Sequence, residues 1–152
     1  MNRFKCSLII ISIFLAASVE AASPLSKFDE FGDINCEDEY ARLDNFAIQL
    51  QNTPDARGYI LFYGGRRFRG RLPRVGEAAV RAGRLKPYLV NRRGIAAEQV
   101  VVINGGHQDN FVIQLWIVPP GAEPPEPENT VPAKEIKFRK GKANKRQFQC
   151  NI

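Results

Sequence analysis

A short loop of the sequence carries the densest group of charged side chains. Five arginines stand between Gly64 and Val75: Arg66, Arg67, Arg69, Arg71 and Arg74. Guanidinium groups bind carboxylates and phosphates through paired hydrogen bonds, and Phe68 adds a ring for stacking among them. A helix predicted directly after the loop would add backbone N–H donors at its start. The loop therefore predicts an anion-binding site; the alternative is a solvated loop whose charge only aids solubility.

The residue types that catalysis and metal binding need are scarce in this chain. All five serines lie at or before Ser26, so the predicted domain has no serine nucleophile. His107 is the only histidine and falls in a predicted turn, where we expect a solvated side chain. No His, Cys and carboxylate residues have the spacing of a metal site, and Gly64-Gly65 lacks the Gly-Lys-Ser/Thr of a phosphate-binding loop. We therefore expect a protein that is not an enzyme, with no metal and no cofactor.

Three apolar runs are predicted as the strands that position this loop. They are Gly58–Tyr63, Val100–Ile103 and Phe111–Val118. The first two are apolar on both faces, which is typical of strands at a sheet centre or covered on both sides. The polar stretch Asn104–Asn110 between the last two is predicted as a hairpin turn.

Two helices and an edge strand are predicted around these runs. Lys27–Phe31 has the composition of a short edge strand. The acidic residues after Asn35 begin a helix whose apolar stripe continues to about Gln51. A second helix is predicted over Val75–Asn91, with a kink at Pro87 because proline removes one backbone hydrogen bond.

The N-terminus has the pattern of a signal peptide. Two basic residues precede the apolar run Leu8–Ala17, which is too short to span a bilayer. Small residues then predict cleavage near Ala21 or Ala22, so residues 1–22 are predicted to be removed. The alternative is a signal anchor that is never cut. We expect a soluble periplasmic or secreted protein, with no other stretch able to cross a membrane.

Two cysteines remain after that cleavage, Cys36 and Cys150. In an oxidising compartment such an even pair predicts one disulfide; the alternative is two free thiols, one of them catalytic. The six prolines and three glutamates of Pro119–Pro132 predict a stiff, extended linker. Residues 133–152 form a basic tail, and the disulfide would bring the end of this tail back to the first helix.

Several segments between Leu43 and Val118 share a pattern with a known family. They are Leu43-Asp44 with Phe46-Ala47 and Leu50, then Tyr63-Gly64-Gly65, Arg81-Ala82, Tyr88-Leu89-Val90 and Gly94-Ile95. Their order resembles the peptidoglycan-associating OmpA-like C-terminal domain, whose elements run strand, helix, strand, helix, strand, strand. The resemblance implies an α/β (α+β) two-layer sandwich with a mixed sheet over residues 23–118.

The same resemblance implies where a ligand would bind. In that family a loop aspartate holds the ammonium of diaminopimelate in peptidoglycan, and an arginine fifteen residues later on the second helix holds its carboxylate. Arg81 matches this arginine, Arg66 stands at the aspartate position and Arg74 at the position of a family asparagine. That family also has a pair of basic residues ahead of its last strand, and this pair has no counterpart before Phe111. Because an arginine repels an ammonium, the pattern implies contacts to carboxylates instead.

These observations together predict a non-catalytic binding module of the cell envelope. The net charge of +6 favours anionic partners, and predicted export makes envelope polymers likelier targets than nucleic acid. The ligand would be peptidoglycan or another anionic polymer, held by Arg66, Arg67, Arg74 and Arg81. The alternative is a structural domain, or one that binds another envelope protein, in which polymer binding has been lost.

Overall fold

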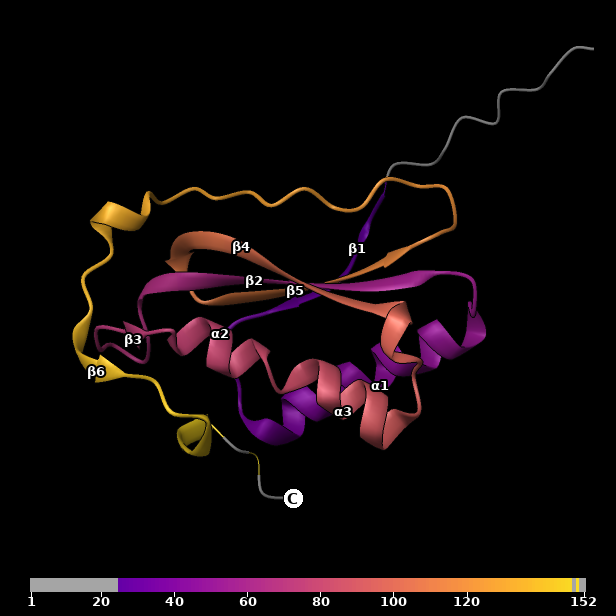
Figure 1. Cartoon of the computed structure of the whole chain (residues 1–152), viewed down its shortest axis with the longest axis horizontal. Helices are drawn as coiled ribbons and strands as arrows, with labels where there is room; N and C mark the ends of the chain where they lie inside the picture. The colour runs from indigo at the N-terminus through magenta and orange to yellow at the C-terminus, as the bar shows by residue number, and fades with distance from the viewer. Residues whose placement is uncertain (1–24, 149, 151–152) are drawn as a thin grey trace, which may run out of the picture.

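The computed structural model describes residues 25–148 and residue 150. A four-stranded sheet forms one layer, and three helices cover one of its faces (Figure 1). The strands are β1 (Lys27–Phe31), β2 (Arg57–Arg67), β4 (Val100–Asn110) and β5 (Val112–Val118), and the helices are α1 (Cys36–Asn52), α2 (Glu77–Ala82) and α3 (Leu85–Arg93). The strand order is β1-β5-β2-β4, with β2 and β4 parallel and the other pairs antiparallel. The predicted two-layer α/β class with a mixed sheet is therefore confirmed.

The predicted signal peptide, residues 1–22, lies outside the described residues. Within the described residues, no helix is both long and apolar enough to cross a membrane.

The first helix begins where its capping residue predicts. The Asn35 side chain accepts a hydrogen bond of 2.8 Å from the backbone N–H of Asp38, and acidic residues fill the first turn. The buried face of α1 presents Leu43, Phe46 and Leu50 to the sheet, where all three are fully buried. Cap and apolar stripe together fix both the start and the orientation of α1.

The opposite face of the sheet is covered by the proline-rich segment Pro119–Pro132 (Figure 1). This segment has neither helix nor strand, as its composition predicts. It nevertheless packs closely, since the hydroxyl of buried Tyr63 accepts a 3.2 Å hydrogen bond from the N–H of Glu128. The carbonyl of His107 accepts two more, from the N–H groups of Thr130 and Val131. The predicted linker is therefore a cover for the second face of the sheet.

The predicted single helix over Val75–Asn91 is wrong, because two short helices occupy that stretch. α2 ends at Ala82 and α3 begins at Leu85, so the break falls at Gly83 and Arg84. Pro87 lies in the first turn of α3. Backbone N–H groups in a first turn have no partner within the helix, so the N–H that proline lacks costs no helical hydrogen bond. The expected kink at Pro87 is thus replaced by a helix boundary ahead of it.

The predicted hairpin turn at Asn104–Asn110 is also wrong. β4 continues through this stretch beside β2, and β5 then pairs with β2 on its other side. The connection crosses β2 at Gly65, where an added Cβ would lie 2.4 Å from the backbone N of Phe111. Gly105 is required for a similar reason, because the Tyr63 ring lies where its Cβ would be. The glycines that suggested a turn serve close packing within a bulged strand.

The basic tail folds back over the domain, as the cysteine pair predicts. Its strand β6 (Arg139–Lys142) pairs in parallel with β3 (Arg74–Val75), directly before α2. The tail also contains the 3₁₀ turns η2 (Ala133–Glu135) and η3 (Lys145–Phe148). The disulfide between Cys36 and Cys150 spans a Cα–Cα distance of 5.7 Å and holds the tail to the start of α1.

Candidate anion-binding site

The arginine loop is shorter than predicted, because β2 extends to Arg67. A tight turn follows, in which Phe68 and Arg71 exchange two backbone hydrogen bonds of 2.7 and 2.9 Å. Its two central residues, Arg69 and Gly70, have positive φ angles of 47° and 72°, as turns of type I′ require. The turn therefore places the side chains of Phe68, Arg69 and Arg71 beside α2.

Arg81 of α2 is the most enclosed arginine of this group. Only 8 % of the residue is exposed, and its Cζ lies 3.4 Å from the Phe68 ring centre and 4.4 Å from that of Phe148. Its Nη1 donates a 3.0 Å hydrogen bond to Asp33, which also accepts from Arg69. Burial lowers the pKa of Arg81, and the charges of Asp33 and Glu77 oppose that shift. The guanidinium is thus a fixed buried charge, stacked between rings of the loop and the tail.

A buried carboxylate lies at the centre of the arginines. Glu77 is 3 % exposed, and its Oε2 accepts a 2.8 Å hydrogen bond from the backbone N–H of Arg74. The Nε of Arg81 lies 3.7 Å from Glu77 Oε1, and the Nη2 of Arg139 lies 3.9 Å from Glu77 Oε2. One carboxylate therefore contacts the backbone of β3 and the guanidinium groups of an arginine from α2 and one from β6.

These side chains line a polar cavity of about 400 Å³, called here the arginine cavity. Its lining residues are Phe68, Arg69, Arg71, Arg74, Glu77, Arg81, Arg139 and Phe148. Five of these are arginines and one is a carboxylate, while Asp33 offsets part of the charge from outside the lining. An excess of guanidinium groups around a small cavity is suited to binding an anion.

Some buried polar atoms of this cavity are not satisfied within the described part of the chain. Glu77 Oε1, Arg81 Nε and Arg139 Nε are each buried and have no hydrogen-bond partner there. Buried polar atoms are normally paired with protein, water or ligand. Arg81 Nε and Glu77 Oε1 face each other as an ion pair at 3.7 Å, which is longer than a hydrogen bond, so these two atoms together with Arg139 Nε favour a polar guest in the arginine cavity.

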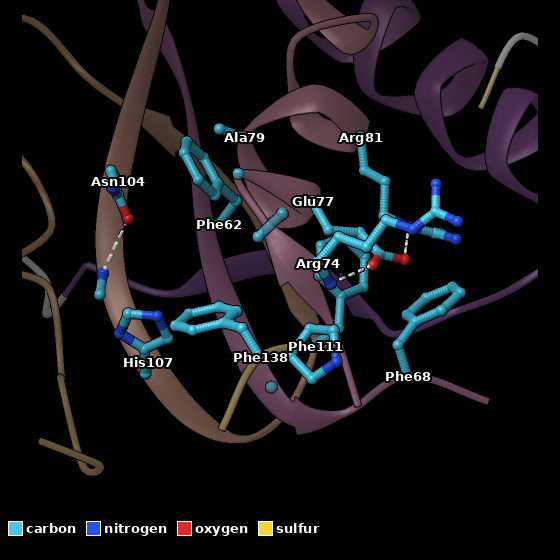
Figure 2. A pocket seen from close by; sticks show the side chains of 16 residues that line it. Phe62, Phe68, Arg74, Glu77, Ala79, Arg81, Asn104, His107, Phe111 and Phe138 are labelled. Carbon is cyan, nitrogen blue, oxygen red and sulfur yellow. Dashed lines mark hydrogen bonds and ion pairs between the residues drawn. The ribbon is translucent and has the colours of Figure 1, made fainter. Parts of the chain in front are cut away.

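A second, apolar cavity of about 260 Å³ adjoins the first, called here the phenylalanine cavity. Figure 2 shows it between the rings of Phe62, Phe111 and Phe138, with the charged group of Glu77 and Arg81 at one side. Its lining residues are Phe62, Gly64, Gly65, Phe68, Pro73, Arg74, Gly76, Glu77, Ala78, Ala79, Arg81, Asn104, Gly106, His107, Phe111 and Phe138. The two cavities have Phe68, Arg74, Glu77 and Arg81 in common.

The structure brings together two of the four predicted ligand residues. Arg74 and Arg81 line both cavities, whereas Arg66 and Arg67 line neither. Arg66 forms ion pairs with Glu135 and Asp109, at 2.6 and 2.9 Å, and these hydrogen bonds raise its pKa. Arg67 donates a 3.1 Å hydrogen bond to the carbonyl of Gly70. Both belong to the end of β2 and have partners outside the lining of the arginine cavity.

Other residues of the site come from the tail and were not predicted. Arg139 and Phe148 line the arginine cavity, and Phe138 lines the phenylalanine cavity. The predicted disulfide was the signal that could have placed them, since it returns the tail to this side of the domain. His107, expected in a solvated turn, instead forms part of β4 and of the cavity wall. In the described part of the chain, no three His, Cys, Asp or Glu residues are grouped as a metal site.

No protein-family model matches this sequence, and no curated protein matches it significantly.

Proposed function

We propose that the protein is a non-catalytic binding module of the cell envelope. Its arginine cavity holds carboxylate or phosphate groups of an anionic envelope polymer, with peptidoglycan as the first candidate. The observation that carries this proposal is the group of five arginines around one cavity that is lined by a single carboxylate among the described residues. The guanidinium groups of these arginines would hold a carboxylate or phosphate through paired, charge-assisted hydrogen bonds.

The order of the main elements supports a relation to the OmpA-like C-terminal domain. β1, α1, β2, the pair of α2 and α3, β4 and β5 follow the order strand, helix, strand, helix, strand, strand. Arg81, the residue that matches that family's carboxylate-binding arginine, lies in the same cavity as the loop arginines. Its Nη1 is bonded to Asp33, so the ligand would also be held by other arginines that line the cavity, such as Arg71.

The disulfide supports a location outside the cytoplasm. Structural disulfides persist in oxidising compartments and are rare where thiols are kept reduced. The Cys36–Cys150 bond therefore fits a periplasmic or secreted protein whose signal peptide is cleaved near Ala21 or Ala22. In that location envelope polymers are the abundant polyanions.

Co-sedimentation of the purified protein with insoluble peptidoglycan, at several salt concentrations, tests the proposal. The double variant Arg71→Gln/Arg139→Gln removes two cations of the arginine cavity. The matched control Arg57→Gln/Arg92→Gln removes two exposed arginines that line neither cavity. We expect the first variant to lose most binding and the control to keep it.

Salt should weaken the parent's binding, because the Debye length falls from about 10 Å at 0.1 M to about 3 Å at 1 M. Equal losses in the two double variants would mean that net charge alone attracts the polymer, and would contradict the proposal. Absence of binding by the parent would favour the alternative of a structural domain or one that binds another envelope protein.

A further inference from the structure

The phenylalanine cavity stays open because small residues form part of its wall. Gly64 lies opposite Ala78, and a Cβ added at Gly64 would lie 2.8 Å from the His107 ring and 3.7 Å from the Ala78 Cβ. Phe62 and Phe111 are buried beside this space, while Phe138 is 42 % exposed. The cavity therefore combines an apolar interior with a partly exposed ring on its wall.

The phenylalanine cavity and the arginine cavity share part of their walls. Phe68 and Arg81 belong to both walls, with the guanidinium stacked on the ring. Glu77 Oε1 and Arg81 Nε, two of the buried atoms without a hydrogen-bond partner in the described chain, lie at this shared wall. A guest with its apolar part among the phenylalanines can therefore reach the guanidinium of Arg81 with an acceptor group at its polar end.

We propose that the group bound here is an amphiphilic acid: a carboxylate carried at the end of a short apolar arm. This inference rests on the proposed anion-binding function and specifies the chemistry of its ligand. The carboxylate lies among Arg71, Arg74 and Arg139, and the arm lies against Phe62 and Phe138. A cavity of about 260 Å³ holds roughly eight water-sized groups, at about 30 Å³ each, which suits an arm of several carbon atoms.

The charge of the arginine cavity argues against a neutral apolar guest. A hydrocarbon alone would fill the phenylalanine cavity but would add no hydrogen bond to Arg81 Nε and Arg139 Nε, which have none within the described part of the chain. An inorganic anion alone would satisfy these donors and leave the apolar walls facing water. An amphiphilic acid meets both requirements, so its affinity should depend on charge and on chain length together.

Three probes test this with the oxidised protein: butyrate, octanoate and the neutral octyl glucoside, each titrated by NMR chemical-shift mapping. Burial of each methylene contributes about 0.8 kcal/mol at most, or three- to fourfold in affinity. We expect octanoate to bind at least tenfold more tightly than butyrate, with shifts at both cavities. Octyl glucoside should bind at least tenfold more weakly than octanoate.

Variants separate the two halves of the site. Ala78→Leu fills the phenylalanine cavity and should abolish the chain-length effect while butyrate binding persists. Ala41→Leu, on an exposed position of α1, is the matched control and should change nothing. Arg139→Gln should weaken both acids by the same factor. If Ala78→Leu fails to fold, Phe138→Ala at the partly exposed wall should reduce octanoate binding at least threefold.

The outcomes distinguish this inference from the function on which it rests. Equal affinities of the parent for butyrate and octanoate would overturn the apolar arm and leave the anion site intact. Binding of octyl glucoside as tightly as octanoate would also overturn it, because charge would then play no part. If neither acid binds, both the inference and the proposed anion site are wrong.

Discussion

The Cζ atom of Arg81 lies 4.4 Å from the centre of the Phe148 ring, so a residue of α2 meets a residue of η3. The Phe148 backbone carbonyl accepts a hydrogen bond from Arg84, which ties the backbone of η3 to the residue that precedes α3. The disulfide at Cys150 lies two residues further along. The tail is therefore a wall of the candidate site and part of the environment that holds Arg81.

Replacing Arg81 by lysine should destabilise the protein although the charge is kept. Lysine has no planar fork to stack between Phe68 and Phe148 while bonding to Asp33. A hydrogen bond between charged groups contributes about 1.5–3 kcal/mol, so we expect a loss of about 2 kcal/mol in urea unfolding. The control Arg92→Lys, on the exposed end of α3, should stay within about 0.5 kcal/mol of the parent. Equal effects of the two changes would mean that the stacking contributes nothing measurable.

Reduction of the Cys36–Cys150 disulfide should weaken both stability and binding. The bond closes a loop with a sequence separation of 114, which in the chain-entropy model contributes about 4–5 kcal/mol. Unfolding with and without reductant measures this difference, and co-sedimentation of the reduced protein measures the loss of Phe148 and Arg139 from the site. Intact-mass analysis after alkylation checks the starting state. Two alkylatable thiols in protein recovered from the periplasm would refute the disulfide.

A side chain at Gly65 should strain the crossing of β2 by the β4–β5 connection. The three atoms nearest to the Cβ of Gly65→Ala would be backbone atoms of Phe111, Asn110 and Arg67, at 2.4–2.9 Å. We expect a loss of about 3 kcal/mol, the upper end for overpacking. The contrasting variant Gly58→Ala meets side-chain ends of Leu50 and Phe46, which can shift, and should cost less. Thermal unfolding of both variants checks the order, and the reverse order would contradict this account of the crossing.

Proline should be tolerated at residue 87 and not one turn later. Pro87→Ala should change stability by less than about 1 kcal/mol, since the first turn of α3 needs no N–H donor at that position. Asn91→Pro, at an exposed position inside α3, should cost about 3 kcal/mol or more. Urea unfolding of both variants provides the test. A large gain from Pro87→Ala would instead indicate that the proline kinks one longer helix.

Local signals were sufficient for part of the fold. The edge strand Lys27–Phe31, the capped start of α1 and the apolar β2 depend on neighbouring residues, and each was found from the sequence. The failures involve distant partners. In the sequence Gly105 indicates a turn. The structure needs a glycine there for another reason, because the Tyr63 ring of another strand packs over it.

The candidate site divides in the same way. Arg74 and Arg81 lie in the loop and helix that the sequence pointed to, and the structure brings them together. The sequence also predicts Arg66 as a ligand residue, because it belongs to the same group of loop arginines. In the structure its ion-pair partners are Asp109 of β4 and Glu135 of the tail. Arg139 joins the site through the pairing of β6 with β3. The local sequence of neither strand predicts this pairing.

The order of strands in the sheet has a consequence for synthesis. β5 lies between β1 and β2, and in the described chain β1 pairs with β5 alone. A nascent polypeptide that has emerged as far as Asn110 holds the β2–β4 pair but has no neighbour for β1. Contacts between such distant segments form late, since long loops must close first. The sheet is therefore completed only after Val118 has left the ribosome, and until then the edge strand β1 has no partner to pair with.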